Sequence, residues 1–258
     1  MDHAERNERM WDEQSRAYQE RHGSQLDESG GATWGLWQVP EDELHVLGEV
    51  AGRDVLEFGC GAAQWSIALQ ARGARIVGVD ISARQLDHAR ELMRAADVDF
   101  PLVHANAEAT PFPDASFDIV FCDHGAMTFA DPRRTVPEAG RLLRKGGLFA
   151  FCMHTPVLDV AWAADADHPS DRLVLDYFSM HALEFPDEPT VFQLPYGEWI
   201  HLFRENRLMI EDLIELRPAA DALSSYRSEA DREWARRWPM EHIWRLRKAG
   251  PAAVAALP

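Results

Sequence analysis

The stretch VLEFGCGAA, residues Val55 to Ala63, decides the fold. It opens with a mostly apolar run typical of a buried strand, and two glycines lead directly into a helical pattern. Glycines at such a turn let the backbone approach a ligand, and the helix N-terminus offers free N–H groups to it. We therefore expect a strand–turn–helix unit that binds a small molecule, and any side chain at Gly59 to fill the ligand's space.

On either side of this unit, residues 53–154 alternate short apolar runs with helical patterns. We expect helices over 62–72, 82–96 and 135–144, with Ser82 and Thr135 capping the last two. The expected strands are Asp54–Phe58, Arg75–Asp80, Phe100–His104, Phe117–Cys122 and Leu148–Met153. This alternation is typical of βαβ units around a parallel sheet buried on both faces.

The whole chain of 258 residues is expected to form one α/β domain with four parts. These are an N-terminal helical cover over 1–50, a core over 53–154, an insertion over 155–190, and a C-terminal part of the sheet over 195–250. In the last part we expect a helix over 197–206, a strand over 208–216, an Arg-rich helix over 227–237 and a final strand over 242–248.

The composition of the chain argues against several classes of function and location. Hydrophobic residues make up 46% of the chain and the net charge is −17, so nucleic acid and anionic membranes are poor partners. The charged start, Met1 to Gln14, predicts no signal peptide, and no apolar run is long enough to span a bilayer. Three cysteines without a C-x-x-C pair argue against disulfides and structural zinc, and favour a reducing cytoplasm.

Two cofactor classes use a glycine turn of this kind. A dinucleotide fingerprint, G-x-G-x-x-G, requires a small third residue, but Gln64 stands there, and Glu57 precedes the first glycine by two residues. The second strand ends in Asp80, 21 residues after Gly59, where a carboxylate can accept both hydroxyls of a ribose. The pattern favours the acid-x-G-x-G loop that holds S-adenosylmethionine over an NAD loop.

Two further stretches carry a family resemblance. Residues 106–120 read NAEATPFPDASFDIV, and residues 138–147 read EAGRLLRKGG. With the glycine turn and Asp80, they resemble the class I S-adenosylmethionine-dependent methyltransferases, in the small-molecule branch that includes the ubiquinone/menaquinone-type enzymes. The resemblance is strong over about 50–155. Asn106 stands where the family usually has Asp, and Lys145 where it usually has Pro.

The resemblance implies a Rossmann-like, doubly wound sheet of seven strands with the last one antiparallel. It also implies S-adenosyl-L-methionine as cofactor, S-adenosyl-L-homocysteine as product, and no metal. The expected cofactor contacts are Tyr18, Trp37, Glu57, Gly59, Cys60, Gly61, Ala62, Asp80, Ile81, Gln85, Asn106, Ala107, Glu108, Asp123 and His124.

The methyl acceptor is expected to be a small organic molecule. If it presents a hydroxyl, His124 or His154 is expected to act as the base; a nitrogen, sulfur or carbon nucleophile needs none. The insertion holds eight acids against Arg172, interleaved with aromatic residues, and is expected to cap the carboxyl-end edge of the sheet. Its charge indicates either a solvated lid or a preference for a cationic acceptor. The chamber-lining candidates are Trp162, Tyr177, Phe178, Phe185, Tyr196, Glu198 and Trp199.

Two other functions stay open on the sequence. The chain is alternatively a non-catalytic protein that keeps this fold and binds its ligand, or a nicotinamide-dependent oxidoreductase. The acceptor, the oligomeric state and the pathway are not encoded in any motif.

Overall fold

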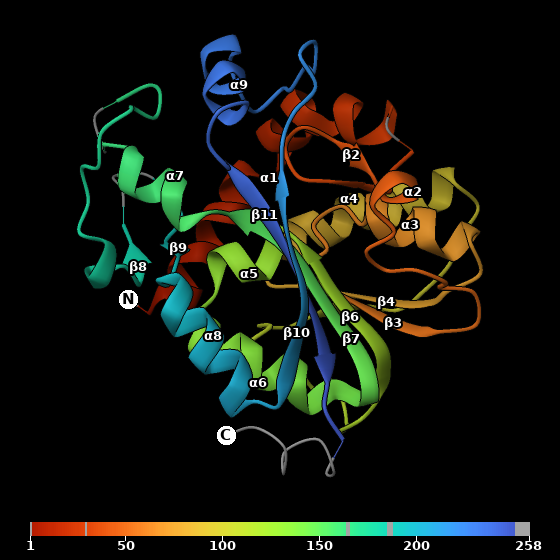
Figure 1. Ribbon diagram of the computed structural model, residues 1–258. Helices are drawn as coiled ribbons and strands as arrows, with labels where there is room; N and C mark the ends of the chain where they lie inside the picture. Colours follow the sequence, from red (N-terminus) through yellow and green to blue (C-terminus); the bar gives the residue numbers. More distant parts are fainter. Residues whose placement is uncertain (1, 29, 164–165, 185–187, 251–258) are drawn as a thin grey trace.

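A seven-stranded sheet forms the centre of the computed structural model, which describes residues 2–28, 30–163, 166–184 and 188–250 (Figure 1). The strand order is β10-β11-β7-β6-β3-β4-β5. The strands are β3 (Asp54–Phe58), β4 (Arg75–Asp80), β5 (Leu102–His104), β6 (Phe117–Asp123), β7 (Leu143–His154), β10 (Leu208–Leu216) and β11 (Glu241–Lys248). Strands β3 to β7 pair in parallel, and β11 is antiparallel to both its neighbours. The predicted α/β sheet with an antiparallel last strand is confirmed.

Helices cover both faces of the sheet (Figure 1). On one face lie α2 (Glu41–Leu44), α3 (Gln64–Ala71) and α4 (Ala83–Ala95), whose apolar residues join one buried core. On the other face lie α5 (Gly125–Phe129), α6 (Pro132–Leu142) and α8 (Tyr196–Glu205), which join a second core. The parallel strands are thus buried on both sides, as their continuous apolar runs predict.

The helix starts test the predicted caps. Ser82 caps α4, because its hydroxyl accepts the N–H of Gln85. The prediction for the next helix is wrong: α6 begins at Pro132, and the Asp131 side chain accepts the N–H of Arg133. Thr135 lies inside that helix. An Asp followed by Pro supplies both a cap acceptor and a first residue whose φ is already helical, so this pair sets the helix start.

The long helix α1 (His3–Glu28) crosses the carboxyl ends of the parallel strands (Figure 1). A short hairpin, β1 (Thr33–Trp34) and β2 (Val39–Pro40), connects it to α2. The helix α9 (Glu229–Ala235) precedes β11, and the segment before α9 contacts α1 through Tyr226 and Tyr18. No described helix has the length and apolar character that crossing a bilayer requires.

The acidic segment after β7 contains α7 (Pro156–Ala161), the 3₁₀ turn η1 (Tyr177–Ser179), β8 (Ala182–Leu183) and β9 (Val191–Phe192). It lies on the carboxyl-end side of the sheet: His181 bonds Asp131, and the backbone of Thr190 bonds the side chain of Asn7 in α1. Phe185 and two of the eight acids of the insertion, Asp165 and Asp187, lie outside the described residues.

Candidate functional site

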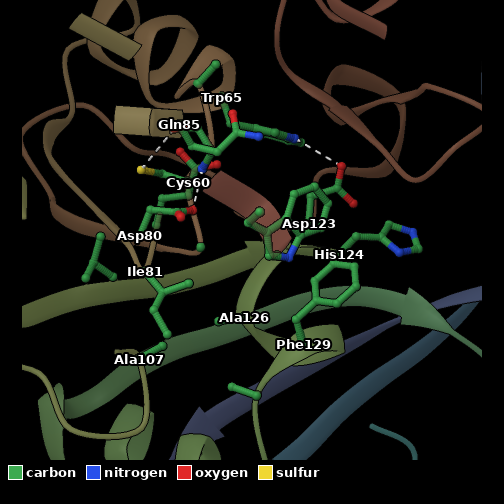
Figure 2. A pocket seen from close by; sticks show the side chains of 18 of the residues that line it. Cys60, Trp65, Asp80, Ile81, Gln85, Ala107, Asp123, His124, Ala126 and Phe129 are labelled. Atoms are coloured by element: carbon green, nitrogen blue, oxygen red, sulfur yellow. Dashed lines mark hydrogen bonds between the residues drawn. The ribbon is translucent and has the colours of Figure 1, made fainter. Parts of the chain in front are cut away.

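One cavity lies between α1 and the carboxyl ends of β3, β4 and β6 (Figure 2). Most of the predicted contacts line it together, although they come from separate segments of the chain. These residues are Tyr18, Glu57, Gly59, Cys60, Gly61, Ala62, Asp80, Ile81, Gln85, Asn106, Ala107, Glu108, Asp123 and His124. In Figure 2, Cys60, Asp80 and Gln85 lie on one side of the cavity, and Asp123 and His124 lie on the other.

The two glycines of the turn, Gly59 and Gly61, have different structural roles. Both have left-handed backbones, with φ of 72° at Gly59 and 52° at Gly61. A Cβ at Gly59 would come within 2.3 Å of the backbone nitrogen of Ala126, so this glycine packs the turn against α5. The prediction that a side chain at Gly59 fills ligand space is therefore wrong. A Cβ at Gly61 would meet no atom within 4 Å, so Gly61 is the residue that leaves room in the cavity.

Asp80 holds the turn as well as facing the cavity. Its carboxylate accepts the N–H of Gly61 and the N–H of Ser82, each at 2.8 Å. Burial raises the pKa of Asp80, although these two hydrogen bonds oppose the rise. A carboxylate offers about four lone-pair positions, so two remain for a ligand's hydroxyl groups.

Glu57 supports the helix that follows the turn. Its side chain is buried and accepts both the N–H and the hydroxyl of Ser66 in α3. Burial raises the pKa of Glu57 to about 8, so the group is mostly protonated at neutral pH. Glu57 thus joins β3 to the first turn of α3 and lines the base of the cavity.

The segment after β5 folds into a tight turn. The Asn106 side-chain oxygen accepts the N–H of Glu108 at 2.9 Å, which leaves the amide NH₂ of Asn106 without a partner among the described residues. Glu108 is tied elsewhere: it contacts His3 and Arg134, and accepts the N–H of Asp131. The amide NH₂ of Asn106 is therefore available to donate hydrogen bonds to a ligand in the cavity, and Glu108 holds the start of α1 against the core through His3.

Helix α1 closes the cavity from above. Gln19 donates a hydrogen bond to Gln85, and Asp12 accepts one from the Ser82 hydroxyl. The hydroxyls of Tyr18 and Tyr226 lie 2.9 Å apart, which links α1 to the segment before α9. The cover over the cavity is therefore formed by α1 and Tyr226.

Asp123 ends strand β6 on the far side of the cavity, and His124 follows it at the start of α5 (Figure 2). Asp123 accepts the N–H of Gly35 at 3.0 Å and the indole N–H of Trp65 at 3.4 Å. Burial raises its pKa to about 6. His124 has a φ of 59°, a left-handed value that a non-glycine residue adopts only where the surroundings impose it.

The imidazole of His124 is paired with a buried carboxylate. Its Nε2 lies 2.6 Å from Oε1 of Glu241, the first residue of β11, and the same oxygen accepts the N–H of Leu36. Burial alone would lower the pKa of His124, but the hydrogen bond to Glu241 and the charges of Glu241 and Asp123 outweigh it, so the pKa is raised. A proton on Nε2 leaves Nδ1 with a lone pair and no partner among the described residues.

Two predicted site residues lie elsewhere. Trp37 packs in a separate apolar cluster with Leu158, Trp234 and Met240 rather than in the cavity. His154 does not line the cavity either; its Nε2 lies 3.2 Å from Asp159 Oδ2. Placing a base at His154 is thus not supported by the geometry of this cavity.

The described aromatic residues of the acidic segment do not line the cavity, contrary to expectation. Trp162 hydrogen-bonds the backbone of Ala166, and the Tyr177 hydroxyl accepts the N–H of Tyr196. Phe178 is 83% exposed, and Trp199 lies in the core beside Phe151. Two candidates remain: Glu198 pairs with Arg133, and the Tyr196 hydroxyl lies 3.3 Å from Nδ1 of His242, outside the cavity.

The sequence missed several residues that line the cavity: His3, Trp11, Trp65, Phe129 and Tyr226. Trp11, Tyr18 and Phe129 form edge-to-face aromatic contacts, with ring centroids 5.0 to 5.3 Å apart. Apolar positions of a long amphipathic helix were a signal for Trp11, but nothing in the sequence near Tyr226 indicates that it reaches the cavity.

Among the described residues, Asp123, His124 and Cys152 have side-chain donors close enough to hold a metal ion, all within 4.8 Å of one another. Each donor is poorly suited to that role. Asp123 and His124 already have hydrogen-bond partners, and burial raises the pKa of the Cys152 thiol well above its ordinary value. We assign no metal to this group.

Known proteins share this fold and sequence pattern. Residues 56–151 match the family model of a methyltransferase domain. The chain is 30% identical over 160 residues to an uncharacterized methyltransferase, YcgJ, of Bacillus subtilis, covering 62% of this chain and 58% of that protein. It is 34% identical over 143 residues to a demethylmenaquinone methyltransferase of Clavibacter sepedonicus, covering 55% and 56%. The chain thus spans somewhat over half the length of these relatives.

A solved structure extends the likeness in fold. An S-adenosylmethionine-dependent methyltransferase from Mesorhizobium loti superposes with a TM-score of 0.62 at 24% identity, covering 79% of this chain and 94% of that one. At this identity the likeness concerns the fold alone.

Proposed function

We propose that this chain is a class I S-adenosylmethionine-dependent methyltransferase and that it transfers a methyl group to a small organic acceptor in the cavity under α1. One observation carries the proposal: the glycine turn, Asp80, the Asn106 segment and the His124–Glu241 pair all meet at this cavity. The glycine turn, Asp80 and the Asn106 segment suit the binding of a nucleoside, and the His124–Glu241 pair suits a proton transfer beside it.

The cavity fits the cofactor of this family. Gly61 leaves open space at the turn, where the amino-acid tail and the ribose edge would lie. Asp80 has lone pairs for the ribose hydroxyls, and Ile81 offers an apolar surface to adenine. Asn106 and Ala107 would hold the adenine edge. The buried Nε2 of Gln64 has no partner among the described residues and marks a further unfilled polar position.

S-adenosylmethionine, when bound, supplies a methyl group on a cationic sulfonium that is open to in-line displacement. The aromatic rings of Trp11, Tyr18 and Phe129 line the cavity and favour a cation near their faces. Helix α1 and Tyr226 cover the cavity, and the exclusion of water by a bound ligand beneath them would strengthen the electrostatic interactions there. Alignment and exclusion of water are what the chain contributes to any acceptor.

For a hydroxyl acceptor, His124 is the base. Its Nε2–H donates to Glu241, so Nδ1 is free to take the hydroxyl proton as the oxygen attacks. The imidazolium formed in this way is balanced by the buried Glu241 carboxylate, in the manner of a His–carboxylate dyad. Glu241 is therefore a positioning residue, and nitrogen, sulfur or carbon acceptors would use the same cavity without the proton step.

We further propose that residues 1–258 work as one domain, because α1, the hairpin and β11 all contribute to the walls or supports of the cavity. A net charge of −17 argues against nucleic acid as the acceptor.

Cofactor binding and methyl transfer test the proposal separately. Calorimetry should give binding of S-adenosylmethionine and S-adenosylhomocysteine and none of NADH, with binding weakened by Asp80→Asn. Transfer of labelled methyl from the cofactor to a mixed extract of small metabolites should follow. Binding of NADH instead would overturn the proposal in favour of an oxidoreductase. Tight cofactor binding with no transfer to any fraction would favour a binding protein.

A further inference from the structure

Arg227 is a cation with no close partner. It follows Tyr226, which lines the cavity, and its guanidinium carbon lies 4.8 Å from the centroid of the Trp162 ring. The side chain is half-buried and its Nε is fully buried. No hydrogen bond or ion pair joins this guanidinium to any other residue that the structure describes, and Nε in particular has no acceptor.

A buried guanidinium nitrogen without an acceptor is costly, because the buried donors of a charged group are normally paired with a carboxylate or another acceptor. The acids that face Arg227 from neighbouring elements have other partners. Glu241 in β11 accepts from His124 and Leu36, and Asp231 in α9 accepts from Ser228. Asp159 in α7 lies 3.2 Å from His154, although without hydrogen-bond geometry.

Two buried oxygens of the acids whose charges act on Arg227 also lack partners: Oε2 of Glu241 and Oδ2 of Asp159. Nε2 of His154, 3.2 Å from that Asp159 oxygen, has no hydrogen-bond partner among the described residues either. Native proteins leave few such atoms unpaired, and a group of them indicates a place where water or a ligand binds. Because Oε1 of Glu241 lies 2.6 Å from His124 Nε2, Glu241 connects this group to the proposed base.

We propose that Arg227 binds the negative charge of the methyl acceptor, a small organic molecule that carries one carboxylate. This inference rests on the proposed function and deepens it. With Trp162 over one face of the guanidinium, its edges remain for the two oxygens of a carboxylate, which Arg binds bidentately. The nucleophilic group of the acceptor then lies toward His124, next to the cavity.

The surrounding acids set the charge of the ligand. One monoanion would pair with the guanidinium, whereas a second negative charge would be repelled by Glu241, Asp159 and Asp231, whose charges already act on Arg227. An acceptor with a positive charge would meet Arg227 itself. The cationic acceptor that the acidic segment indicated is therefore not the class that this site favours.

The test compares acids with their neutral amides on the protein loaded with S-adenosylhomocysteine. Benzoate, phenylacetate and 4-hydroxybenzoate, each with its primary amide, are titrated by ligand-observed NMR. At least one acid should bind about tenfold or more tighter than its amide, a difference of about 1.4 kcal/mol. Arg227→Gln should abolish this preference, and Arg227→Lys should keep part of it. Arg237, which lies over Trp238 on the exposed surface, supplies the matched control Arg237→Gln, which should change nothing.

The proposal is overturned if no acid binds, if each amide binds as tightly as its acid, or if the preference survives Arg227→Gln. The wild-type comparison stands even if that variant fails to fold. The same titrations are made without S-adenosylhomocysteine, whose own affinity is measured by calorimetry. Failure of S-adenosylhomocysteine to bind would overturn the proposed function alone, because the comparison of acids with amides is then still read on the free protein.

Discussion

Replacing Glu241 by Gln removes the charge that supports His124 and little else. The amide oxygen of Gln occupies the place of Oε1, so it still accepts from His124 Nε2 and from the N–H of Leu36. A hydrogen bond to a charged group contributes about 1.5–3 kcal/mol, against about 1 kcal/mol for a neutral one. The difference is about 0.5–2 kcal/mol, and since the imidazolium forms as the hydroxyl attacks, kcat for a hydroxyl acceptor should fall about twofold to thirtyfold.

The pH profile identifies the cause of that loss. Glu241 raises the pKa of His124, and the base acts in its neutral form, so activity should increase with pH through a midpoint above the ordinary 6.5. In Glu241→Gln this midpoint should move to lower pH, while the S-adenosylmethionine affinity stays within about twofold. Exposed Glu233→Gln serves as the control. An unmoved midpoint with kcat within twofold of wild type would refute the dyad.

Three further outcomes follow from the cavity. Gly61→Ala should keep the fold, because its Cβ meets nothing within 4 Å and the left-handed φ of 52° costs Ala only about 1–2 kcal/mol. It should nevertheless weaken S-adenosylmethionine binding at least about tenfold by calorimetry. Gly59→Ala should lower the free energy of unfolding by about 1–3 kcal/mol beyond such backbone strain, because its Cβ overlaps the backbone of Ala126. Asp80→Asn should weaken the binding of both S-adenosylmethionine and S-adenosylhomocysteine about tenfold to a hundredfold. The exposed Asp87→Asn variant is the control. Equal affinities in the two variants would show that Asp80 does not bind the ribose. Burial raises the pKa of Glu57 to about 8 from an ordinary 4.5, so its contribution to stability is full below pH 4.5 and declines as pH rises toward 8. In Glu57→Gln, the free energy of unfolding from chemical denaturation should depend less on pH between 4.5 and 8. The same pH dependence in the variant and the wild type would contradict a protonated Glu57.

Local sequence signals predicted the sheet well. Buried parallel strands need continuous apolar runs, and each run between residues 54 and 153 became a strand in the expected order. The cavity residues from Glu57 to His124 were predictable for a related reason. In such sheets ligands bind at the carboxyl ends of strands, so any polar residue directly after a run is a candidate.

The cover and the supports of the cavity were not predictable in this way. Glu241 lies 117 positions after His124 and reaches it only because β11 inserts between β7 and β10. Tyr226 meets Tyr18 from 208 positions away. Trp37 looked like a contact because it stands near the start of the core, but the hairpin turns it toward α7 and α9. Long-range packing of this kind leaves no local pattern to read.

The division between α1 and the sheet has an evolutionary consequence. The family model matches residues 56–151, which contain the glycine turn, Asp80 and Asn106, whereas α1, Tyr226 and Arg227 all lie outside it. Under the proposed function, sequence changes at either end of the chain would alter the cover of the cavity and the proposed acceptor contact while leaving the proposed nucleoside contacts in place. Chimeras that graft residues 1–50 of one relative onto the core of another would sample that variation directly.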